Sequence, residues 1–343
     1  MNRSQPTIKD VAAQAGVSRQ TVSRVLNDKP EVAPETRARV QDAIAALGYR
    51  PNLAARSMVV GRSCSLGCIS PSLTDHTFAS MIESAQDEAR RRGYFMLTGS
   101  APTVADVEPL LEEMLRRQVD GLLAIDPCAD GRHRVLYPLI RRGVPLVYLS
   151  SAPCDEQVSL IRCDDDDAGY QATLYLLDLG HRAIATILGP DHEQCTFDRL
   201  DGYQRALVQA GLEPEPPLAV AGDWSAASGY RAARQLLAAR RPFTAIFSQN
   251  DQMAVGAIRA LREAGCRVPD HVSVIGFDDI PLASYFDPPL TTIRQPMEEF
   301  GRLGARMLIK AMDDPTRPAE QILLPGQLII RASCSLPVVH PPG

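Results

Sequence analysis

Apolar residues recur at two different spacings along this chain, and the spacing changes near residue 62. In residues 1–50 they return every three or four positions, which is typical of amphipathic helices. Beyond residue 62, short apolar runs alternate with helical stretches, as in SLGCIS followed by FASMIESAQDEARRRG. Strands alternating with helices predict parallel sheets joined by right-handed crossovers. The body is therefore expected to be an α/β fold.

The first 50 residues carry the start and stop signals of three short helices. Thr7 and Asp10 have the spacing of a capping box, and Gly16 supplies a left-handed turn after the first helix. Ser18 can cap a second helix, and a third is expected from about residue 34 to residue 47. Two short helices joined by a glycine turn, with a third bracing them, predict a helix-turn-helix.

In a helix-turn-helix, the start of the second helix meets base edges in the major groove. Arginine offers a paired donor for guanine and glutamine suits adenine, so the predicted base-reading residues are Arg19, Gln20 and Arg24. Short polar side chains suit phosphate oxygens, and here these are Ser18, Thr21, Ser23 and Asn27.

The charge distribution agrees with a DNA-binding head. The net charge of the 343 residues is −5, yet residues 1–60 hold nine Lys and Arg against five Asp and Glu. A head of +4 on a body of −9 predicts an anionic partner for the head. The alternative is a small helical bundle whose polar residues are merely solvated.

The body offers a ring of polar residues just after its expected strands. Ligands of open α/β folds bind outside the carboxyl ends of strands, so these positions form the predicted effector site. Arginine, carboxylate and amide groups with an aromatic face suit a polyhydroxylated ligand. The predicted effector-binding residues are Ser72, Phe78, Ser150, Arg199, Trp224, Asn250, Asp278 and Gln295. His76 and Asp126 are weaker candidates; Asn250 and Asp278 could instead cap helices, and Trp224 could belong to the core.

Other chemistries find little support in the sequence. Asp164–Asp167 could suggest a metal, but a helix is expected to follow immediately, and stabilising its N-terminus is the preferred interpretation. The eight cysteines form no CxxC pair and are expected to be free thiols. No catalytic, metal or cofactor motif appears, so we expect no enzyme activity, no metal and no cofactor. No apolar run suits a membrane span and no secretory signal is evident, so we expect a cytoplasmic protein.

The head closely resembles a known family. The stretches TIKDVAAQAGVSRQTVSRVLN and EVAPETRARVQDAIAALGYRPNLAARSM resemble the headpiece of the LacI-type (LacI/GalR family) bacterial transcriptional regulators. The match continues into the body through GDWS, SQNDQMAVGA, GFDD and PPLTTIRQP.

The resemblance implies three regions. Residues 1–50 would be the DNA-binding headpiece, 51–61 the hinge helix and linker, and 62–340 a two-lobed, periplasmic-binding-protein-like domain for effector binding and dimerisation. Lobe 1 would comprise about 62–160 and 292–320, and lobe 2 about 161–291 and 321–340. By the same resemblance, the hinge helix orders when a dimer sits on a pseudo-palindromic operator, with Asn52, Ala55 and Met58 in the minor groove. Met58 would be the wedge between bases, where the family usually has leucine.

The resemblance also implies a function. The protein would be a homodimeric repressor of double-stranded operator DNA, controlled by a sugar or sugar derivative that contacts Arg199, Trp224, Asn250, Asp278 and Gln295. Many sugar-binding members have aspartate at the position of Ser150. The tetrameric members carry a leucine-heptad tail and this chain ends in LPVVHPPG, so a dimer is expected. The effector could instead be a purine, a phosphosugar or a phosphoprotein co-repressor. The sequence also leaves open whether the effector is an inducer or a co-repressor, and whether the chain is a sugar-binding protein without a DNA role.

Overall fold

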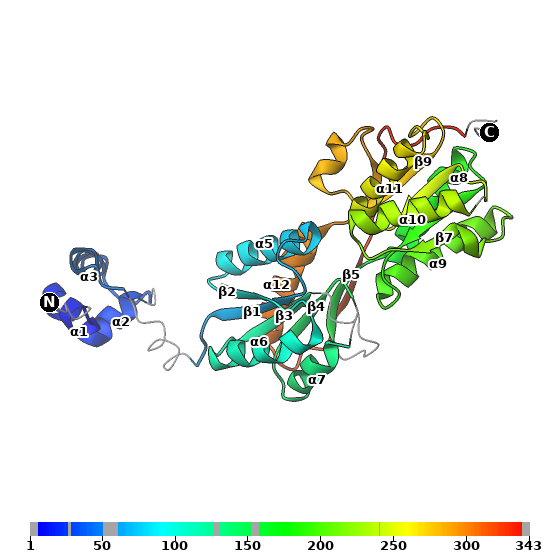
Figure 1. Ribbon diagram of the computed structural model, residues 1–343. Helices are drawn as coiled ribbons and strands as arrows, with labels where there is room; N and C mark the ends of the chain where they lie inside the picture. The colour runs from blue at the N-terminus through cyan, green and yellow to red at the C-terminus, as the bar shows by residue number, and fades with distance from the viewer. Residues whose placement is uncertain are drawn as a thin grey trace. The chain divides into compact units, whose positions relative to one another are not determined.

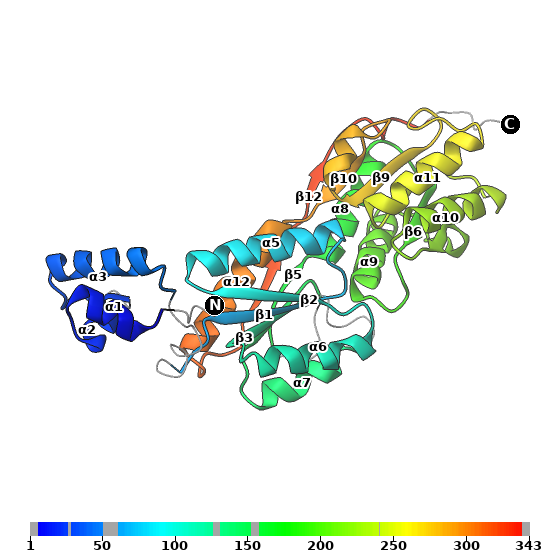
Figure 2. The ribbon, with the colours of Figure 1, turned by 60° about the vertical axis from the view of Figure 1, so that its left-hand side comes forward.

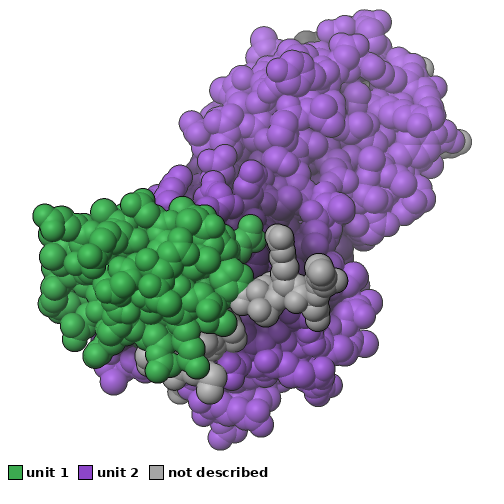
Figure 3. Space-filling view, turned by 90° about the vertical axis from the view of Figure 1, so that its left-hand side faces the viewer, with its two compact units in different colours: residues 1–64 green, residues 65–343 purple. Residues whose placement is uncertain are grey.

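The change of pattern near residue 62 coincides with a division of the chain into two units, residues 1–64 and 65–343 (Figure 3). The computed structural model describes residues 6–26, 29–50, 61–125, 131–151, 158–239 and 241–337. The boundary lies three residues beyond the expected one.

Unit 1 contains the three expected helices, α1 (Ile8–Ala15), α2 (Arg19–Leu26) and α3 (Pro34–Leu47). Gly16 and Gly48 end α1 and α3 in the left-handed conformation, with φ of 66° and 61°. One small apolar core joins the helices, and its buried residues are Val11, Ala12, Ala15, Val22, Val25, Val32, Val40 and Ala43.

Unit 2 contains two six-stranded sheets, one in each of two lobes (Figure 1). The sheet of lobe 1 has the order β11-β5-β4-β3-β1-β2 and that of lobe 2 the order β12-β10-β9-β8-β6-β7. The strands of lobe 1 are β1 (Ser65–Ser70), β2 (Phe95–Ser100), β3 (Gly121–Ile125), β4 (Leu146–Leu149), β5 (Ser159–Cys163) and β11 (Gln321–Leu324). The strands of lobe 2 are β6 (Ile184–Leu188), β7 (Ala219–Ala221), β8 (Ala245–Ser248), β9 (Ser273–Asp278), β10 (Thr291–Arg294) and β12 (Gln327–Ile329). Every pairing is parallel except that of β12 with β10, which confirms the α/β prediction.

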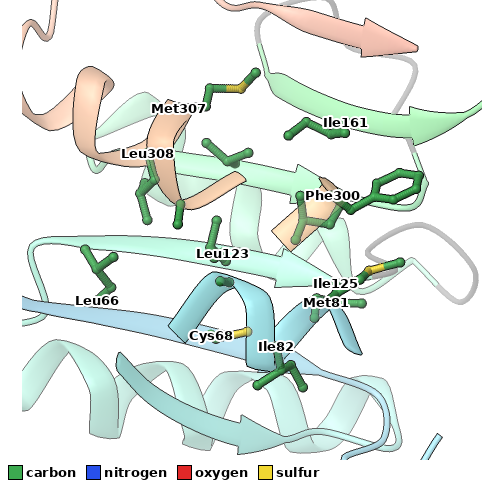
Figure 4. Packing of buried hydrophobic residues seen from close by; sticks show 14 of the residues in the cluster. Leu66, Cys68, Met81, Ile82, Leu123, Ile125, Ile161, Phe300, Met307 and Leu308 are labelled. Carbon is green, nitrogen blue, oxygen red and sulfur yellow. The ribbon is translucent and has the colours of Figure 1, made fainter. Parts of the chain in front are cut away.

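Helices cover both faces of each sheet. Lobe 1 has α5 (His76–Arg91), α6 (Val104–Arg116), α7 (His133–Arg141) and α12 (Met297–Asp313). Lobe 2 has α8 (Asp165–Asp178), α9 (Gln194–Gln209), α10 (Ala226–Ala238), α11 (Asp251–Glu263) and two short 3-10 helices, Pro216–Leu218 and Pro281–Tyr285. Apolar side chains fill the space between each helix layer and its sheet; Figure 4 shows Leu123, Phe300 and Leu308 in the layer under α5 and α12.

The chain crosses between the lobes three times, after β5, after β10 and after β11. The expected boundaries were therefore wrong by part of a strand or a whole strand. Residues 161–163 and 321–324 pair within the sheet of lobe 1, and residues 292–294 pair within that of lobe 2. The physical reason is that a short apolar strand can pair in either sheet, and only its tertiary partners decide which.

Two helix pairs, one in each lobe, approach closely through glycine. In lobe 1, α12 lies beside α5 although the two are far apart in the sequence (Figure 2). A Cβ atom at Gly301 would collide there with the carbonyl oxygen of Met81. In lobe 2, Gly169 and Gly202 bring α8 against α9, and a Cβ at Gly202 would collide with the carbonyl oxygen of Asp166.

Candidate functional site

Helix α2 presents the predicted base-reading residues to solvent, Arg19 and Gln20 at its start and Arg24 in its last turn. Arg19, Gln20 and Arg24 are all exposed. The hydroxyl of Ser18 accepts a hydrogen bond from the backbone N–H of Thr21 (3.1 Å), which caps the helix as the sequence predicted. The exposed side of α2 therefore carries two arginines and a glutamine on a capped helix, an arrangement suited to nucleic acid.

The remaining predicted DNA contacts differ in their surroundings. Thr21 and Ser23 are half-buried, and Ser18 is exposed. Asn27 and the predicted hinge residues Asn52, Ala55 and Met58 lie outside the described residues.

A cleft between the two lobes brings together side chains from many separate segments. Its volume is about 300 Å³. The lining residues are Pro71, Asp75, Thr77, Phe78, Met81, Pro102, Arg132, Ser150, His192, Glu193, Cys195, Arg199, Trp224, Asn250, Asp278, Gln295 and Met297. The size is at the lower end of the range for small-molecule sites, and the mixture of polar and apolar groups is typical of them.

Most of the predicted effector residues line this cleft. Ser72 does not: its hydroxyl accepts hydrogen bonds from the backbone N–H groups of Thr74 and Asp75, both at 3.1 Å, and so shapes the loop before α5. His76 is exposed and is not part of the lining. Asp126 lies outside the described residues.

Arg199 is buried in the wall of the cleft and is held by contacts on several sides. Its Nε donates to Oδ1 of Asp165 (2.7 Å), and its Nη1 donates to the carbonyl oxygen of Gln249 (2.6 Å). The guanidinium carbon lies 3.6 Å from the centre of the Phe277 ring and 5.6 Å from that of Trp224. Three kinds of contact thus hold one buried cation in a single orientation.

Asn250 both caps a helix and lines the cleft. Its Oδ1 accepts from the backbone N–H of Met253 (2.8 Å), which makes it the N-cap of α11. Its Nδ2 donates to the carbonyl oxygen of Trp224 (2.9 Å), and this bond holds the loop that carries the indole. Asn250 therefore caps α11 and lines the cleft at the same time.

Two acidic groups lie at the carboxyl end of the lobe 2 sheet. Burial of its carboxyl group raises the pKa of Asp278; the positive charge of Arg199 opposes this shift and the nearby Asp251 adds to it. Oδ1 of Asp278 accepts a hydrogen bond from Nε2 of Gln295 (2.7 Å). Asp251 is fully buried at the start of α11, and its oxygens accept from Thr292 Oγ1 (2.6 Å) and from the backbone N–H of Ile280 (2.9 Å). Burial raises the pKa of Asp251 to about 7. Perturbed acids beside a cleft are characteristic of functional sites.

Three of the lining residues have an unusual backbone conformation. Ser150, Trp224 and Asp278 have φ values of 81°, 67° and 111°, in the region that favours glycine. Non-glycine residues persist there only where the surroundings hold them, and such positions concentrate at ligand sites.

Several lining residues were not among the predicted set. Asp75 caps α5, where its carboxylate accepts from the backbone N–H of Thr77 (2.9 Å) and of Phe78 (3.3 Å). Arg132 is buried, and its guanidinium donates to the carbonyl oxygens of Ala101 (3.1 Å) and Pro102 (3.4 Å). The position of Asp75 after β1 was a signal for its place here, whereas no local pattern indicates Arg132.

The four consecutive aspartates have four different environments, and the last of them, Asp167, accepts from Nε2 of Gln171 at 2.5 Å. Asp164 caps α8 through the backbone N–H of Asp167 (3.1 Å), which confirms the helix N-terminus prediction. Asp165 pairs with Arg199, and Asp166 pairs with Arg205 at 2.6 Å on the exposed side of α9.

Among the described residues no group of three His, Cys, Asp or Glu could hold a metal ion. None of the described helices is long and apolar enough to span a membrane.

Comparison with known protein families gives two matches that together cover both units. Residues 7–52 match the family described as bacterial regulatory proteins, lacI family. Residues 173–334 match the periplasmic binding protein-like domain.

Individual relatives match over nearly the whole chain. The regulator CelR of Thermobifida fusca is 36% identical over 96% of this chain and 99% of its own, and the ribose operon repressor of Escherichia coli (strain K12) is 36% identical over 95% and 99%. Among solved structures, the CelR–cellobiose complex has 34% identity and a TM-score of 0.74, covering 96% of this chain and 99% of the other. The lac repressor dimer bound to operator and the anti-inducer ONPF has 30% identity and a TM-score of 0.87, covering 97% and 100%. These matches confirm the resemblance seen in the sequence.

Proposed function

The chain belongs to the lacI family of bacterial regulatory proteins, and on that premise we propose that a sugar or sugar derivative, bound between the two lobes, controls its attachment to an operator. The protein is a DNA-binding transcriptional regulator under small-molecule control.

The chemistry of the cleft is the observation that carries this proposal. Arg199, Asn250, Asp278 and Gln295 supply donors and acceptors, and they come from segments that only the fold unites. Phe78 of lobe 1 and Trp224 of lobe 2 add aromatic faces. Convergent hydrogen-bonding groups with flat apolar surfaces suit the hydroxyls and C–H faces of a sugar ring. The cellobiose bound to the relative CelR supports the same ligand class.

For the DNA side, we propose a homodimer on a pseudo-palindromic operator. Each protomer would place Arg19, Gln20 and Arg24 at one half-site, because all three side chains are exposed on α2, the first two at its start and Arg24 in its last turn. The relative whose structure is a dimer on operator DNA supports this arrangement. A coupling free energy of roughly 1–3 kcal/mol between cleft and operator would change operator affinity about 5- to 150-fold.

The experiment begins by selecting the operator from random double-stranded DNA with the purified protein. Neutral sugars (cellobiose, ribose, glucose), sugar acids, phosphosugars and purines are then screened for a rise in the melting temperature. A ligand at about 100 times its Kd should stabilise the protein by about 2.7 kcal/mol, a rise of several degrees. The ligand found is titrated against the protein–operator complex by fluorescence anisotropy.

Arg199→Ala should abolish the ligand response and leave operator affinity unchanged, because Arg199 belongs to the cleft and the base-reading residues belong to unit 1. Arg205→Ala is the matched control: Arg205 lies on the same helix, but its guanidinium pairs with Asp166 on the exposed side. A normal ligand response by Arg199→Ala would contradict the proposed site.

A purine is the second candidate ligand. The repressor PurR of Histophilus somni (strain 129Pt) is 36% identical over 95% of this chain, as close as the sugar-linked relatives. Phe78 and Trp224 could stack on a base as well as on a sugar ring. Stabilisation by a purine alone in the screen would replace the sugar in this proposal.

A further inference from the structure

Arg199 does not meet the cleft as a free cation. Its charge is balanced inside the protein by Asp165, with both side chains only 6% exposed and 2.7 Å between Nε and Oδ1. The carbonyl oxygen of Gln249 and the ring of Phe277 occupy further sides of the guanidinium. Among the described residues no hydrogen-bond partner is found for Nη2, so this group remains for a ligand.

The position of Asp165 follows from the packing of α8 on α9. It is the first residue of α8, directly after the chain crosses from lobe 1. Gly169 and Gly202 let the two helix backbones approach so closely that Asp165 reaches Arg199, 34 residues further along the chain. Asp166, one residue on, points to the exposed Arg205 instead.

The pairing changes what Arg199 can recognise. A free buried guanidinium would favour a carboxylate or phosphate, with which it forms paired, charge-assisted hydrogen bonds. With Asp165 already bound, an anionic ligand would place a second negative charge within a few ångströms of the first. Like charges so close in a poorly solvated site repel strongly.

The other charges of the cleft act in the same direction. The carboxyl groups of Asp75 and Glu193 also line it. On the lobe 1 wall, the opposing cation is Arg132, and its guanidinium donates to two backbone carbonyl oxygens. The balance of charge favours a ligand that brings hydroxyl groups without a negative charge.

We propose that Asp165 is the specificity-determining residue that reserves this cleft for uncharged, polyhydroxylated ligands. It neutralises Arg199 and fixes its orientation, so that the remaining N–H groups donate to neutral hydroxyl oxygens. The inference rests on the proposed function, since it concerns the ligand of the same cleft.

The test uses probes that share a sugar ring and differ only in charge. Glucose is compared with glucuronate and glucose 6-phosphate, and cellobiose with cellobionate, by isothermal titration calorimetry on the full-length protein. Wild type should bind the neutral member of at least one set at least tenfold more tightly than its anionic counterpart. Tighter binding of the anionic members by wild type would overturn the inference without any variant.

Asp165→Asn then removes the charge while keeping a similar shape and one acceptor oxygen. The ratio of neutral to anionic affinity should fall at least tenfold, mainly because the anionic probes bind better. Asp166→Asn is the matched control, and its ratio should stay within twofold of wild type. If Asp165→Asn weakens all probes equally, its role is merely structural and the inference is wrong.

The outcomes separate this inference from the proposed function. Binding of sugars with a ratio unaltered by Asp165→Asn overturns the role of Asp165 and leaves the proposed function standing. Binding of none of the probes by wild type overturns the sugar proposal and this inference together. If Asp165→Asn does not fold, Asp165→Ser and the wild-type affinity ratio decide the question.

Discussion

The two lobes have the same strand order but bury acidic side chains in different places. In lobe 1, Glu88 is buried near the end of α5, where Arg92 (2.7 Å) and Arg306 (2.6 Å) both donate to it. In lobe 2, the buried acids Asp165 and Asp251 lie at the first residues of α8 and α11, at the cleft end of the sheet.

The contrast extends to protonation. Hydrogen bonds from Arg306, together with those from Arg92, overcome burial and hold the pKa of Glu88 down, at about 2. Burial outweighs the hydrogen bonds of Asp251 and raises its pKa to about 7. Glu88 in lobe 1 therefore stabilises the α5–α12 pair, whereas the acids of lobe 2 are kept at some cost to stability beside the cleft. Such a cost is characteristic of a site retained for function.

The largest expected effect comes from Asp251→Asn. Because the folded-state pKa of Asp251 is raised, its contribution to stability is complete below about pH 3.8 and is lost as the pH rises through about 7. Asparagine resembles the protonated form, so the variant should be more stable than wild type at pH 8.5, by up to about 4 kcal/mol. Urea unfolding between pH 5 and pH 8.5 measures the difference, which should shrink towards pH 5.

Asp270→Asn is the control for this measurement, because Asp270 forms an exposed pair with Arg267. It should leave the pH profile of wild type unchanged. An Asp251→Asn profile parallel to that of wild type would show that Asp251 is not the group responsible.

Close helix packing gives the next effect, because both lobes use it and only the lobe 2 pair, α8 and α9, is joined by the Asp165–Arg199 ion pair. Gly202→Ala and Gly301→Ala should each destabilise the protein by about 2–3 kcal/mol, since the added methyl group meets backbone atoms. Ligand affinity per folded molecule should fall more for Gly202→Ala than for Gly301→Ala, because α8 and α9 carry the Asp165–Arg199 pair, whereas α5 and α12 supply mainly apolar lining residues. Thermal unfolding and calorimetry give the two quantities.

Gly304→Ala is the matched control on α12. A Cβ at Gly304 would meet the flexible end of the Leu149 side chain, which can move aside. Its cost should stay below about 1 kcal/mol. Equal losses of ligand affinity for Gly202→Ala and Gly301→Ala would remove the distinction between the lobes.

The smallest effect concerns Glu88→Gln. The pKa of Glu88 is lowered, so its contribution is present above about pH 4.5 and is lost as the pH falls through about 2. Removing the charge should cost about 2 kcal/mol at pH 7, a value reduced because Arg92 and Arg306 are partly exposed. Urea unfolding at pH 7 and pH 3 should show the cost shrinking at the lower pH. Glu113→Gln, which alters an exposed pair on α6, should change stability by less than about 0.5 kcal/mol at either pH.

Much of the candidate site could be predicted because parallel strands end at one edge of a sheet. Phe78, Ser150 and Trp224 were expected in the cleft for that reason, and the structure places them there. Ser72 also follows a strand, yet its hydroxyl accepts hydrogen bonds from backbone N–H groups of its own loop and does not line the cleft. Position after a strand therefore brings a residue near the cleft but does not decide what its side chain contacts.

The sequence by itself determined the features that depend on neighbouring residues. In unit 1, α1 begins at the predicted capping box and ends at Gly16, α2 begins after its cap Ser18, and α3 spans the expected Pro34–Leu47 and ends at Gly48. The alternation of strands and helices also predicted two lobes of parallel sheet. These signals act over a few residues, so they can be read directly from the chain.

Only the tertiary structure decided which of the four adjacent aspartates forms the ion pair with Arg199. It also decided to which lobe β5, β10 and β11 belong. Both outcomes depend on segments that are distant in the sequence. The choice of Asp165 requires α8 and α9 to touch at Gly169 and Gly202, and the lobe boundaries depend on strand partners. Local patterns carry no information on such contacts, because one short strand or one carboxylate is chemically equivalent to its neighbours until packing distinguishes them.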